Sequence, residues 1–299
     1  MRNKSSSVHR WNNMDYDILV KIFMSLNVMD LISVVSQVCS SWRSACCDPI
    51  LWKKLDLCIQ ISDSCIYAPL QSDAWSYSVS NNNRLMNILK TTSNLSQGNV
   101  TCLIFNFFEY VEDEHLVYAA KRNRNLKRLA LPIWSRLTVS GMRKAFKYWK
   151  GLESLTVPDF KSPMKLMKAI GTNCKNFSEL KLTCNLNLDY ANAIVKYVPK
   201  LKVLSLRATI VFNKETLICI LDGLKHLEVL NICHCEFVFR DTTFSTTLCQ
   251  ELDKTIIEKG SRLREFLACQ TNSCSICQSL KHYEFEKVRR EDEVISLAL

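Results

Sequence analysis

Glycine and proline are both scarce in this chain, which contains only six of each among its 299 residues. So few glycines leave nothing from which to build a glycine-rich phosphate-binding loop. No stretch approaches the roughly 20 consecutive apolar residues that a bilayer span requires, so we expect no membrane contact. Residues 1–10 are polar and basic, which predicts no secretory signal. These shortages argue against a phosphate-loop enzyme, a membrane protein and a secreted one.

Cysteine, in contrast, is abundant, with 15 residues. Without a secretory signal, these cysteines are expected to be reduced thiols inside the cell. Several of them, such as Cys39, Cys102 and Cys219, stand where small apolar residues belong. A free cysteine behaves as a small buried hydrophobe, so the sequence predicts cysteines that fill the core.

Cysteines in the last third of the chain raise the question of a metal site. Cys274-x-x-Cys277 could bind zinc together with Cys269 or with the run Cys233-His234-Cys235. A second Cys-x-x-Cys pair at zinc-finger spacing is missing, however, and no protease-like signature accompanies any cysteine. We therefore expect no metal, no cofactor and no enzymatic activity.

Residues 11–57 carry apolar side chains at helical spacing. Steps of three and four residues place them on two stripes, one for each of two helices. The stripes are Ile18, Leu19, Ile22, Phe23 and Leu26, and then Leu31, Val34, Val35, Val38 and Trp42. Asp15 or Asp17 can cap the first helix and Asp30 the second, and Asp48-Pro49 can open a third short turn. Helices this short bury too little surface to be stable alone, so they need the following domain or a partner.

From Val100 onward the sequence repeats the pattern Leu-x-x-Leu-x-Leu, with other large apolar residues in some copies. Copies begin at Val100, Leu126, Leu152, Phe177, Leu201 and Leu227, at steps of 24 to 26 residues. Trp52-x-x-Leu55-x-Leu57 matches as an earlier copy, and Leu263-x-x-Phe266 as a late copy displaced by an insertion. The repetition predicts one short strand for each copy.

The segments between copies predict one helix each. Ser162-Pro163 is a cap followed by a first-turn proline, and Gly171 is expected to end that helix in a left-handed conformation. Three residues past the last apolar position, Asn185 and Cys235 are expected to bind the turn backbone, with Thr209 a weaker match. A strand and a helix every ~25 residues is typical of a solenoid. An ordinary α/β sheet is the alternative, but its strands would be more continuously apolar.

Residues 59–99 are the least regular part of the chain. They are rich in Ser and Asn, including Asn81-Asn82-Asn83, and they contain Ala68-Pro69. This composition predicts a loop or linker. One short helix is expected inside it, around Leu85, Met86, Ile88 and Leu89.

The net charge of +10 is unevenly distributed. Between Lys121 and Arg207 there are 19 Lys and Arg residues against four acids, a local net charge of +15. Most of these cations are expected on helix faces, where a solvated surface is the simplest interpretation. Residues that flank the buried leucines of a strand point away from the core. Arg128, Lys181 and Arg207 are therefore expected on the open, concave face of the sheet.

The segment from Trp11 to Trp52 resembles an F-box. The residues that carry the resemblance are Asp17-Ile18-Leu19, Ile22-Phe23, Leu26, Asp30-Leu31, Val38-Cys39, Trp42-Arg43 and Leu51-Trp52. Met14-Asp15 stands where the family has Leu-Pro, a loss that loosens the helix start without removing the apolar face. An unrelated helical hairpin is the alternative. The resemblance implies that this segment binds a Skp-type adaptor protein.

An F-box followed by leucine-rich repeats resembles the F-box/LRR-repeat proteins, and especially their small plant members. The resemblance implies an α/β fold in which an N-terminal three-helix F-box is fused to a right-handed leucine-rich-repeat solenoid, or horseshoe. The expected division is 8–52 for the F-box, 53–99 for a first partial repeat and an irregular linker, 100–268 for the repeats, and 269–299 for a C-terminal cap or tail.

For function, the resemblance implies a substrate-recognition subunit of a Skp–cullin–F-box ubiquitin ligase in the nucleus or the cytoplasm. The adaptor and, through it, a cullin are the expected partners, and the chain itself is expected to be non-catalytic. A repeat scaffold or nucleic-acid-binding module that binds the adaptor without directing degradation is the alternative. A receptor assisted by a small molecule is a third interpretation, for which this solenoid is short.

The expected residue roles divide between the two parts. The residues expected to bind the adaptor are Ile18, Leu19, Ile22, Phe23, Leu31, Val38, Cys39 and Trp42. Arg128, Lys181 and Arg207 are expected to bind an acidic segment of the target, because a span of four strands, about 15 Å, suits an extended peptide. Nucleic acid is not expected on this face, since few aromatic side chains are available there to stack bases. Residues 269–299 are expected to pack partly as a polar cap over the last repeat.

Overall fold

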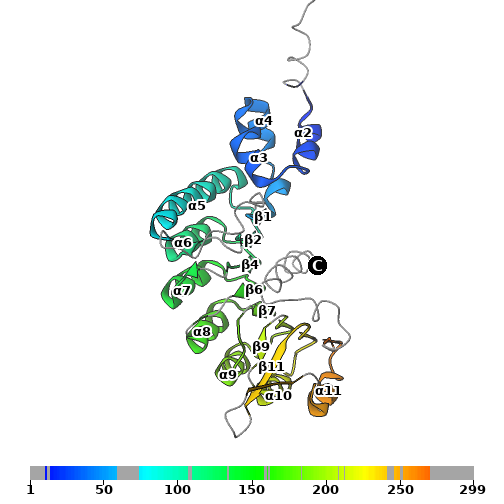
Figure 1. The fold of residues 1–299 in the computed structure, drawn as a ribbon. Coiled ribbons are helices and arrows are strands. Elements are labelled where there is room, and N and C mark those ends of the chain that lie inside the picture. Colours follow the sequence, from blue (N-terminus) through cyan, green and yellow to red (C-terminus); the bar gives the residue numbers. More distant parts are fainter. Residues whose placement is uncertain are drawn as a thin grey trace, which may run out of the picture.

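The computed structural model describes residues 11, 14–58, 74–106, 110–132, 135–157, 160, 162–182, 184–207, 209–211, 213–240, 246–249 and 252–269. These residues form an α/β fold. A group of short helices stands at its N-terminal end, and a parallel sheet with a row of helices follows (Figure 1). Residues 269–299, predicted to form a cap, lie outside the described part of the chain except for Cys269.

The N-terminal helical unit, residues 14–52, contains three α-helices and two 3-10 turns. They are α2 (Tyr16–Phe23), α3 (Val28–Ser33), η1 (Val35–Gln37), α4 (Ser40–Ala45) and η2 (Pro49–Trp52). Asn27 rather than Asp30 caps α3, because its side-chain oxygen accepts a hydrogen bond from the Asp30 backbone N–H at 2.9 Å. Asp48 caps η2 as predicted, accepting from the backbone N–H of Ile50 at 2.9 Å.

The second predicted helix is interrupted at two residues. Val34, with φ −120° and ψ −64°, separates α3 from η1, and extended Cys39 separates η1 from α4. β-Branched residues lose side-chain freedom in a helix, so the valine-rich stretch there favours a break. The break turns Val34 outward, where it is 61% exposed, whereas neighbouring Val35 stays buried. The single apolar stripe expected for this segment was therefore wrong at Val34.

Eight short strands form one parallel sheet. They are β1 (Lys54–Asp56), β2 (Cys102–Ile104), β4 (Arg128–Ala130), β6 (Ser154–Val157), β7 (Glu179–Leu182), β8 (Val203–Ser205), β10 (Val229–Asn231) and β13 (Glu265–Leu267). They stand side by side in chain order. Their register aligns the central apolar residues Leu55, Leu103, Leu129, Leu155, Leu180, Leu204, Leu230 and Phe266. The repeat predicted from the sequence is thus confirmed, including its early and late copies.

Helices α5 to α9 form a row along one side of this sheet (Figure 1). The helices after the N-terminal unit are α5 (Ala74–Ser96), α6 (Asp113–Arg122), α7 (Val139–Tyr148), α8 (Pro163–Asn173), α9 (Leu188–Tyr197), α10 (Lys214–Gly223) and α11 (Lys254–Gly260). From α5 to α11, each helix contacts the next one in the chain. One strand and one helix therefore alternate through the repeats.

Two small sheets lie outside the main one. Strand β3 (Val111–Glu112) pairs with β5 (Ser135–Arg136), and β9 (Ile210–Val211) pairs with β11 (Glu236–Arg240). Strand β12 (Thr246–Cys249) runs antiparallel to β11. This β11–β12 hairpin falls between β10 and α11, and it is the insertion that displaces the last copy of the repeat.

The linker prediction for residues 59–99 was wrong in its second half. A 23-residue helix, α5, replaces the short helix expected around Leu85. Leu85, Leu89 and Leu95 are buried, and α5 contacts α3, η2 and α6. Tertiary packing on both neighbours therefore overrides the weak helix propensity of Ser and Asn.

Two turn predictions are corrected as well. Gly171 lies inside α8 rather than at a left-handed end, and among the described glycines only Gly98 has a positive φ. Asn185 is exposed, and buried Cys184 occupies the equivalent turn position. The reason is the length of the turn. Leu186 pairs with Val211, but the turn from Leu182 to Leu186 is one residue shorter than the turn from Leu206 to Val211.

The core runs through the whole described chain. Buried residues from Leu19 in α2 to Leu263 before β13 form one hydrophobic cluster. Two fully buried tryptophans are anchored by backbone hydrogen bonds: Trp52 Nε1 donates to Cys46 O at 2.6 Å, and Trp149 Nε1 to Asn123 O at 2.7 Å. The N-terminal unit and the repeats therefore share a single core. Among the described residues, no helix has the length and apolar character that a membrane span requires.

Candidate functional site: an apolar surface and a charged sheet

Exposed apolar side chains are concentrated on the N-terminal helical unit. Twelve large apolar side chains are exposed among the described residues, and eight of them fall between residues 11 and 50. We define these eight as the N-terminal apolar surface: Trp11, Tyr16, Ile18, Ile22, Met24, Val34, Val38 and Ile50. Exposed apolar side chains that gather on one part of a fold are typical of protein–protein interaction sites. The concentration therefore indicates a docking surface at this end of the molecule.

The surface arises because α2 is apolar on more than one face. Leu19 and Phe23 are four residues apart and point into the core, where each is 1% exposed. Ile18 and Ile22, also four residues apart, lie on a second face and are 47% and 39% exposed. Residues spaced by four share one face of a helix, so one short helix carries both a core face and an uncovered apolar face.

The eight predicted adaptor-binding residues divide into three groups. Ile18, Ile22 and Val38 are exposed. Cys39 and Trp42 are half-buried, and the Trp42 indole N–H donates to Trp11 O at 3.2 Å. Leu19, Phe23 and Leu31 are buried in the core and hold the helices together. No observation here tests binding itself, so the adaptor role of all eight stays a prediction.

Other members of the N-terminal apolar surface were not among the residues predicted to bind the adaptor. Tyr16, Met24, Val34 and Ile50 are also exposed in this part of the chain. The sequence of α2, YDILVKIF, could have indicated this exposure, because it contains more apolar residues than one buried helix face accommodates. The exposure of Ile50 could not be predicted from the sequence, because it depends on how η2 packs relative to α2.

The three predicted target-binding cations do lie on one sheet. Arg128 is on β4, Lys181 on β7, and Arg207 follows β8 by two residues, so they span four adjacent strands as expected. An Arg128 Nη2 to Glu179 Oε1 ion pair measures 3.9 Å. Lys181 is only 8% exposed, whereas Arg128 and Arg207 are half-buried. Their accessibility is therefore unequal, and the two arginines offer the more open groups.

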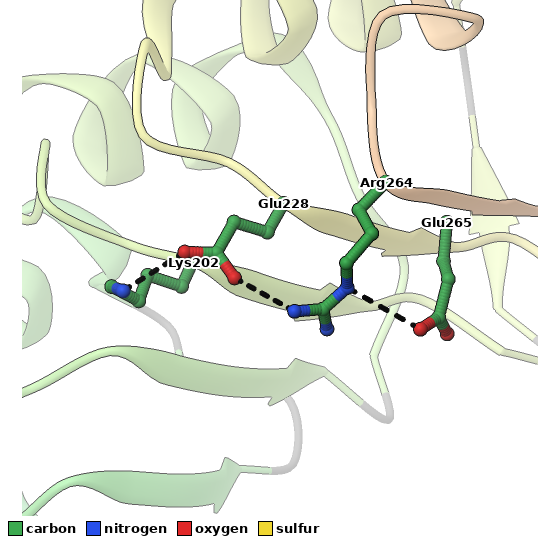
Figure 2. Close-up of polar contacts among 4 residues, drawn as sticks. All are labelled: Lys202, Glu228, Arg264 and Glu265. Carbon is green, nitrogen blue, oxygen red and sulfur yellow. Dashed lines mark hydrogen bonds and ion pairs between the residues drawn. The ribbon is translucent and has the colours of Figure 1, made fainter.

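Charges at the starts of the strands pair across the repeats. Figure 2 shows Glu228 between Lys202 and Arg264: Lys202 Nζ lies 2.8 Å from Glu228 Oε1, and Arg264 Nη1 lies 3.1 Å from Oε2. Arg264 Nε also lies 3.4 Å from Glu265 Oε1. The hydrogen bond and charge of Lys202 lower the pKa of Glu228. This alternating row links β8, β10 and β13 and is a structural feature of the stacked repeats.

The predicted metal site and the reactivity of the thiols can be compared with the described residues. No group of three or more His, Cys, Asp or Glu side chains among them is placed to hold a metal ion, and Cys274 and Cys277 lie outside the described part. Burial raises the pKa of the Cys46 thiol to about 11 and those of Cys174 and Cys235 to about 12. These three thiols therefore stay protonated near neutral pH, which removes their nucleophilic form.

The fold and its exposed surface together define a class: a small helical docking module joined to a strand–helix repeat array. Comparison with known proteins agrees, since the F-box-like family matches residues 16–58. F-box/LRR-repeat protein At3g48880 of Arabidopsis thaliana is 40% identical over 99% of this chain and 98% of its own length. Putative F-box protein At4g11580 from the same plant is 28% identical over 99% and 98%. The chain belongs to the F-box/LRR-repeat protein family.

Proposed function

We propose that this chain is the substrate-recognition subunit of a Skp–cullin–F-box ubiquitin ligase in the nucleus or the cytoplasm. The F-box binds a Skp-type adaptor, the adaptor links it to a cullin, and the repeats hold a protein target. The observation that carries the proposal is the N-terminal apolar surface, seven of whose eight exposed residues lie in the F-box-like segment, residues 16–58. The subunit does no chemistry itself but raises the effective concentration of a target lysine at the ubiquitin-loaded enzyme.

Among the eight residues predicted to bind the adaptor, the exposed ones make the direct contacts. Ile18, Ile22 and Val38 present their side chains to solvent, and Trp42 and Cys39 present part of theirs. Leu19, Phe23 and Leu31 support these residues from the core. Burying the exposed group on an adaptor removes apolar area from water at about 25 cal/mol per Å². The short helices of the unit gain stability from the same contact.

The adaptor interaction is tested with paired substitutions of exposed residues. The double variant Ile22→Asp, Val38→Asp places two charges in the proposed interface, and we expect it to lose about 30-fold or more in adaptor affinity, the effect of one interface hot spot. Met164→Asp, Ile257→Asp is the matched control, because both residues are comparably exposed but lie on α8 and α11. Titration calorimetry with a recombinant Skp-type adaptor measures both. Equal affinity for the two variants would contradict the proposed interface.

The repeats are proposed to form a right-handed leucine-rich-repeat solenoid with the parallel sheet on its concave side. Support comes from the sequential strand order and the aligned central leucines. Parallel strands joined by a crossover helix are right-handed in about 98% of cases. A short parallel strand and a helix in each repeat match the horseshoe pattern.

Target recognition is proposed for the concave sheet face around Arg128, Lys181 and Arg207, which suits an acidic segment of the target. Arginine can engage carboxylates with two parallel hydrogen bonds. In the triple variant Arg128→Glu, Lys181→Glu, Arg207→Glu, we expect the adaptor still to bind while target capture fails. Because Lys181 is nearly buried, the double variant Arg128→Glu, Arg207→Glu keeps the test valid if the triple variant misfolds. Unchanged co-purification of targets in moderate salt would argue against this face.

A degradative receptor and a scaffold that binds the adaptor without degradation predict different partners. Affinity purification of the full chain with and without proteasome inhibition distinguishes them. A receptor gains unstable partners when degradation is blocked, and we expect this result. A set of partners that does not change would favour the scaffold.

A further inference from the structure

The turns that join helices to strands carry a cation in five consecutive repeats. A two-residue turn follows the capping residue of each helix from α6 to α10. The cations in these turns are Arg124, Lys150, Lys175, Lys200 and Lys225, and all are exposed. Because every helix of the row returns to the same edge of the parallel sheet, the five cations line one edge of the molecule.

The last helical turns add cations to the same edge. Lys121 and Arg122 end α6, Lys147 lies one residue before the end of α7, and Lys196 one residue before the end of α9. All four are exposed. We define the basic rim as the exposed cations in the last turns of α6, α7 and α9 and in the two-residue turns that follow α6 to α9: Lys121, Arg122, Arg124, Lys147, Lys150, Lys175, Lys196 and Lys200.

The basic rim differs from the charged row directly beside it. At the strand starts, cations pair with carboxylates: Lys127 Nζ lies 3.0 Å from Glu153 Oε1, and Figure 2 shows a second such pair, Lys202 and Glu228. None of the eight rim cations forms an ion pair with a described carboxylate. The strand starts are thus neutralised within the fold, and the rim is not.

Interactions within the fold explain only part of the rim. Cations near helix C-termini stabilise the helix dipole, and Lys175 Nζ donates to Gly171 O at 3.3 Å. Arg122 and Arg124 lie over the rings of Tyr118 and Tyr148, at 5.8 and 5.7 Å from the ring centres. These contacts orient the side chains but supply no negative charge. Eight like charges on one edge repel each other, so an anionic partner would stabilise the row.

The spacing of the charges along the basic rim indicates which kind of anionic partner fits it. Neighbouring strands are about 4.8 Å apart and packed helices about 8–10 Å, so the three steps from α6 to α9 cover roughly 15–30 Å. Eight cations over that length give one charge every ~2–4 Å. Phosphates of one nucleic-acid strand in a duplex repeat every ~3.4 Å. An extended polypeptide advances about 3.4 Å per residue, so it would need an acid at nearly every position.

We propose that the basic rim binds the phosphate backbone of a nucleic acid without reading its sequence. Three tyrosine rings beside the rim, those of Tyr118, Tyr148 and Tyr197, already have a rim cation over them, which leaves the phosphates as the groups recognised. The rim is separate from the concave sheet face, where few aromatic side chains argued against nucleic acid. The inference does not rest on the proposed ligase function, because it concerns neither the F-box nor the concave face.

The test measures binding of the full chain to a labelled, mixed-sequence single-stranded oligonucleotide by fluorescence anisotropy over a range of salt concentrations. The rim variant is Lys150→Gln, Lys175→Gln, Lys200→Gln. The control variant, Lys53→Gln, Lys90→Gln, Lys254→Gln, removes the same charge from exposed lysines away from the rim. Each lost phosphate contact lowers the slope of log affinity against log salt by about 0.7 for a single strand, so the rim variant should lose about 2.

We expect the rim variant to bind about tenfold or more weakly at low salt, since it loses several phosphate contacts at once. The control variant should bind like the wild type, and both variants should keep their adaptor affinity. The proposal is overturned if the rim and control variants weaken equally, or if the wild type does not bind at low salt. It is also overturned if polyglutamate of the same charge displaces the oligonucleotide as well as unlabelled oligonucleotide does, because the rim would then suit an acidic protein.

Discussion

Cys235 lies where two neighbouring repeats meet, and its thiol contacts the preceding one. Its Sγ donates a hydrogen bond to Leu206 O at 2.9 Å and lies 3.7 Å from Thr209 Oγ1. Thr209 Oγ1 itself donates to Leu206 O at 2.6 Å. The role predicted for Cys235 and Thr209, binding of the turn backbone, is therefore confirmed. The same burial raises the pKa of Cys235 to about 12 from an ordinary value of 9.0.

This pKa shift predicts a loss of stability in alkaline solution. Between pH 9 and pH 12 the unfolded chain has released the thiol proton while the folded chain still holds it. The unfolded state then binds fewer protons, so the free energy of unfolding falls as the pH rises. Below pH 9 both states are protonated and this thiol contributes no pH dependence.

Replacing the thiol tests the prediction. Above pH 9, the free energy of unfolding of Cys235→Ala should fall less steeply with rising pH than that of the wild type. Urea denaturation on both sides of pH 9 measures this difference. Buried Cys46 and Cys174 shift in the same direction, so part of the slope remains. Cys39→Ala, outside the repeats, is the control for loss of a cysteine. An identical slope in wild type and Cys235→Ala would show that this thiol does not titrate differently on folding.

At the scale of an element, helix α8 illustrates how closely the repeats stack. A Cβ atom added to Gly171 would collide with the backbone carbonyl oxygen of Tyr197 at the end of α9. The glycine therefore permits close approach of two helices, not a left-handed turn. A Cβ atom added to Gly223 of α10 would likewise collide with the Val195 side chain of α9. Glycines that allow close helix packing therefore recur in the stacked repeats.

Gly171→Ala should destabilise the protein even though alanine favours a helix by up to about 1 kcal/mol. The collision is with backbone, which cannot rotate away, and overpacking typically costs about 1–3 kcal/mol. Thermal denaturation followed by circular dichroism measures the change. Gly151→Ala is the matched control, because a Cβ atom there meets nothing within 4 Å, and it should leave the midpoint nearly unchanged. A Gly171→Ala midpoint at or above the wild-type value would contradict the close approach.

Helix α5 owes its helical conformation to packing against its neighbours. Its described face places Leu85, Leu89 and Leu95 in the core, and the helix contacts both the N-terminal unit and α6. A segment with many Ser and Asn residues becomes helical because both neighbours bury these leucines. It thereby joins the docking module to the first repeats.

For the whole molecule, the shared core implies that the N-terminal unit does not fold independently. Leu19, Phe23 and Trp52 belong to the same buried cluster as the repeat leucines. Strand β1, which directly follows the unit, pairs with β2 only after an intervening 45 residues. A fragment that ends just after β1 would leave this strand unpaired and part of the buried apolar surface of the unit uncovered.

A fragment of residues 1–58 should therefore show little helix by circular dichroism, since its helices are too short to be stable alone. Adding a Skp-type adaptor should raise the helical signal, because a partner that binds only the folded form shifts the equilibrium towards it. The full chain, in which α5 packs on the unit and β2 pairs with β1, serves as the control and should be helical without the adaptor. A fragment that melts cooperatively by itself would contradict the shared core.

Much of the architecture could be predicted from the sequence because it depends on local periodicity. Apolar steps of three and four residues marked α2, and the Leu-x-x-Leu-x-Leu copies marked the strands that align Leu129, Leu155 and Leu180 in register. These patterns report which side of a backbone faces the core. The F-box resemblance rested on the same residues, and the family comparison supports it.

Only the tertiary structure decided which apolar residues remain uncovered and which cations remain unpaired. Leu19 and Ile18 are neighbours of similar hydrophobicity, yet one is buried and the other exposed. Lys127 and Lys150 lie in the same basic stretch, but only Lys127 meets a carboxylate. Burial and ion pairing depend on residues distant in the chain that packing brings together, whereas periodicity is a property of neighbouring residues and so can be read before the chain folds.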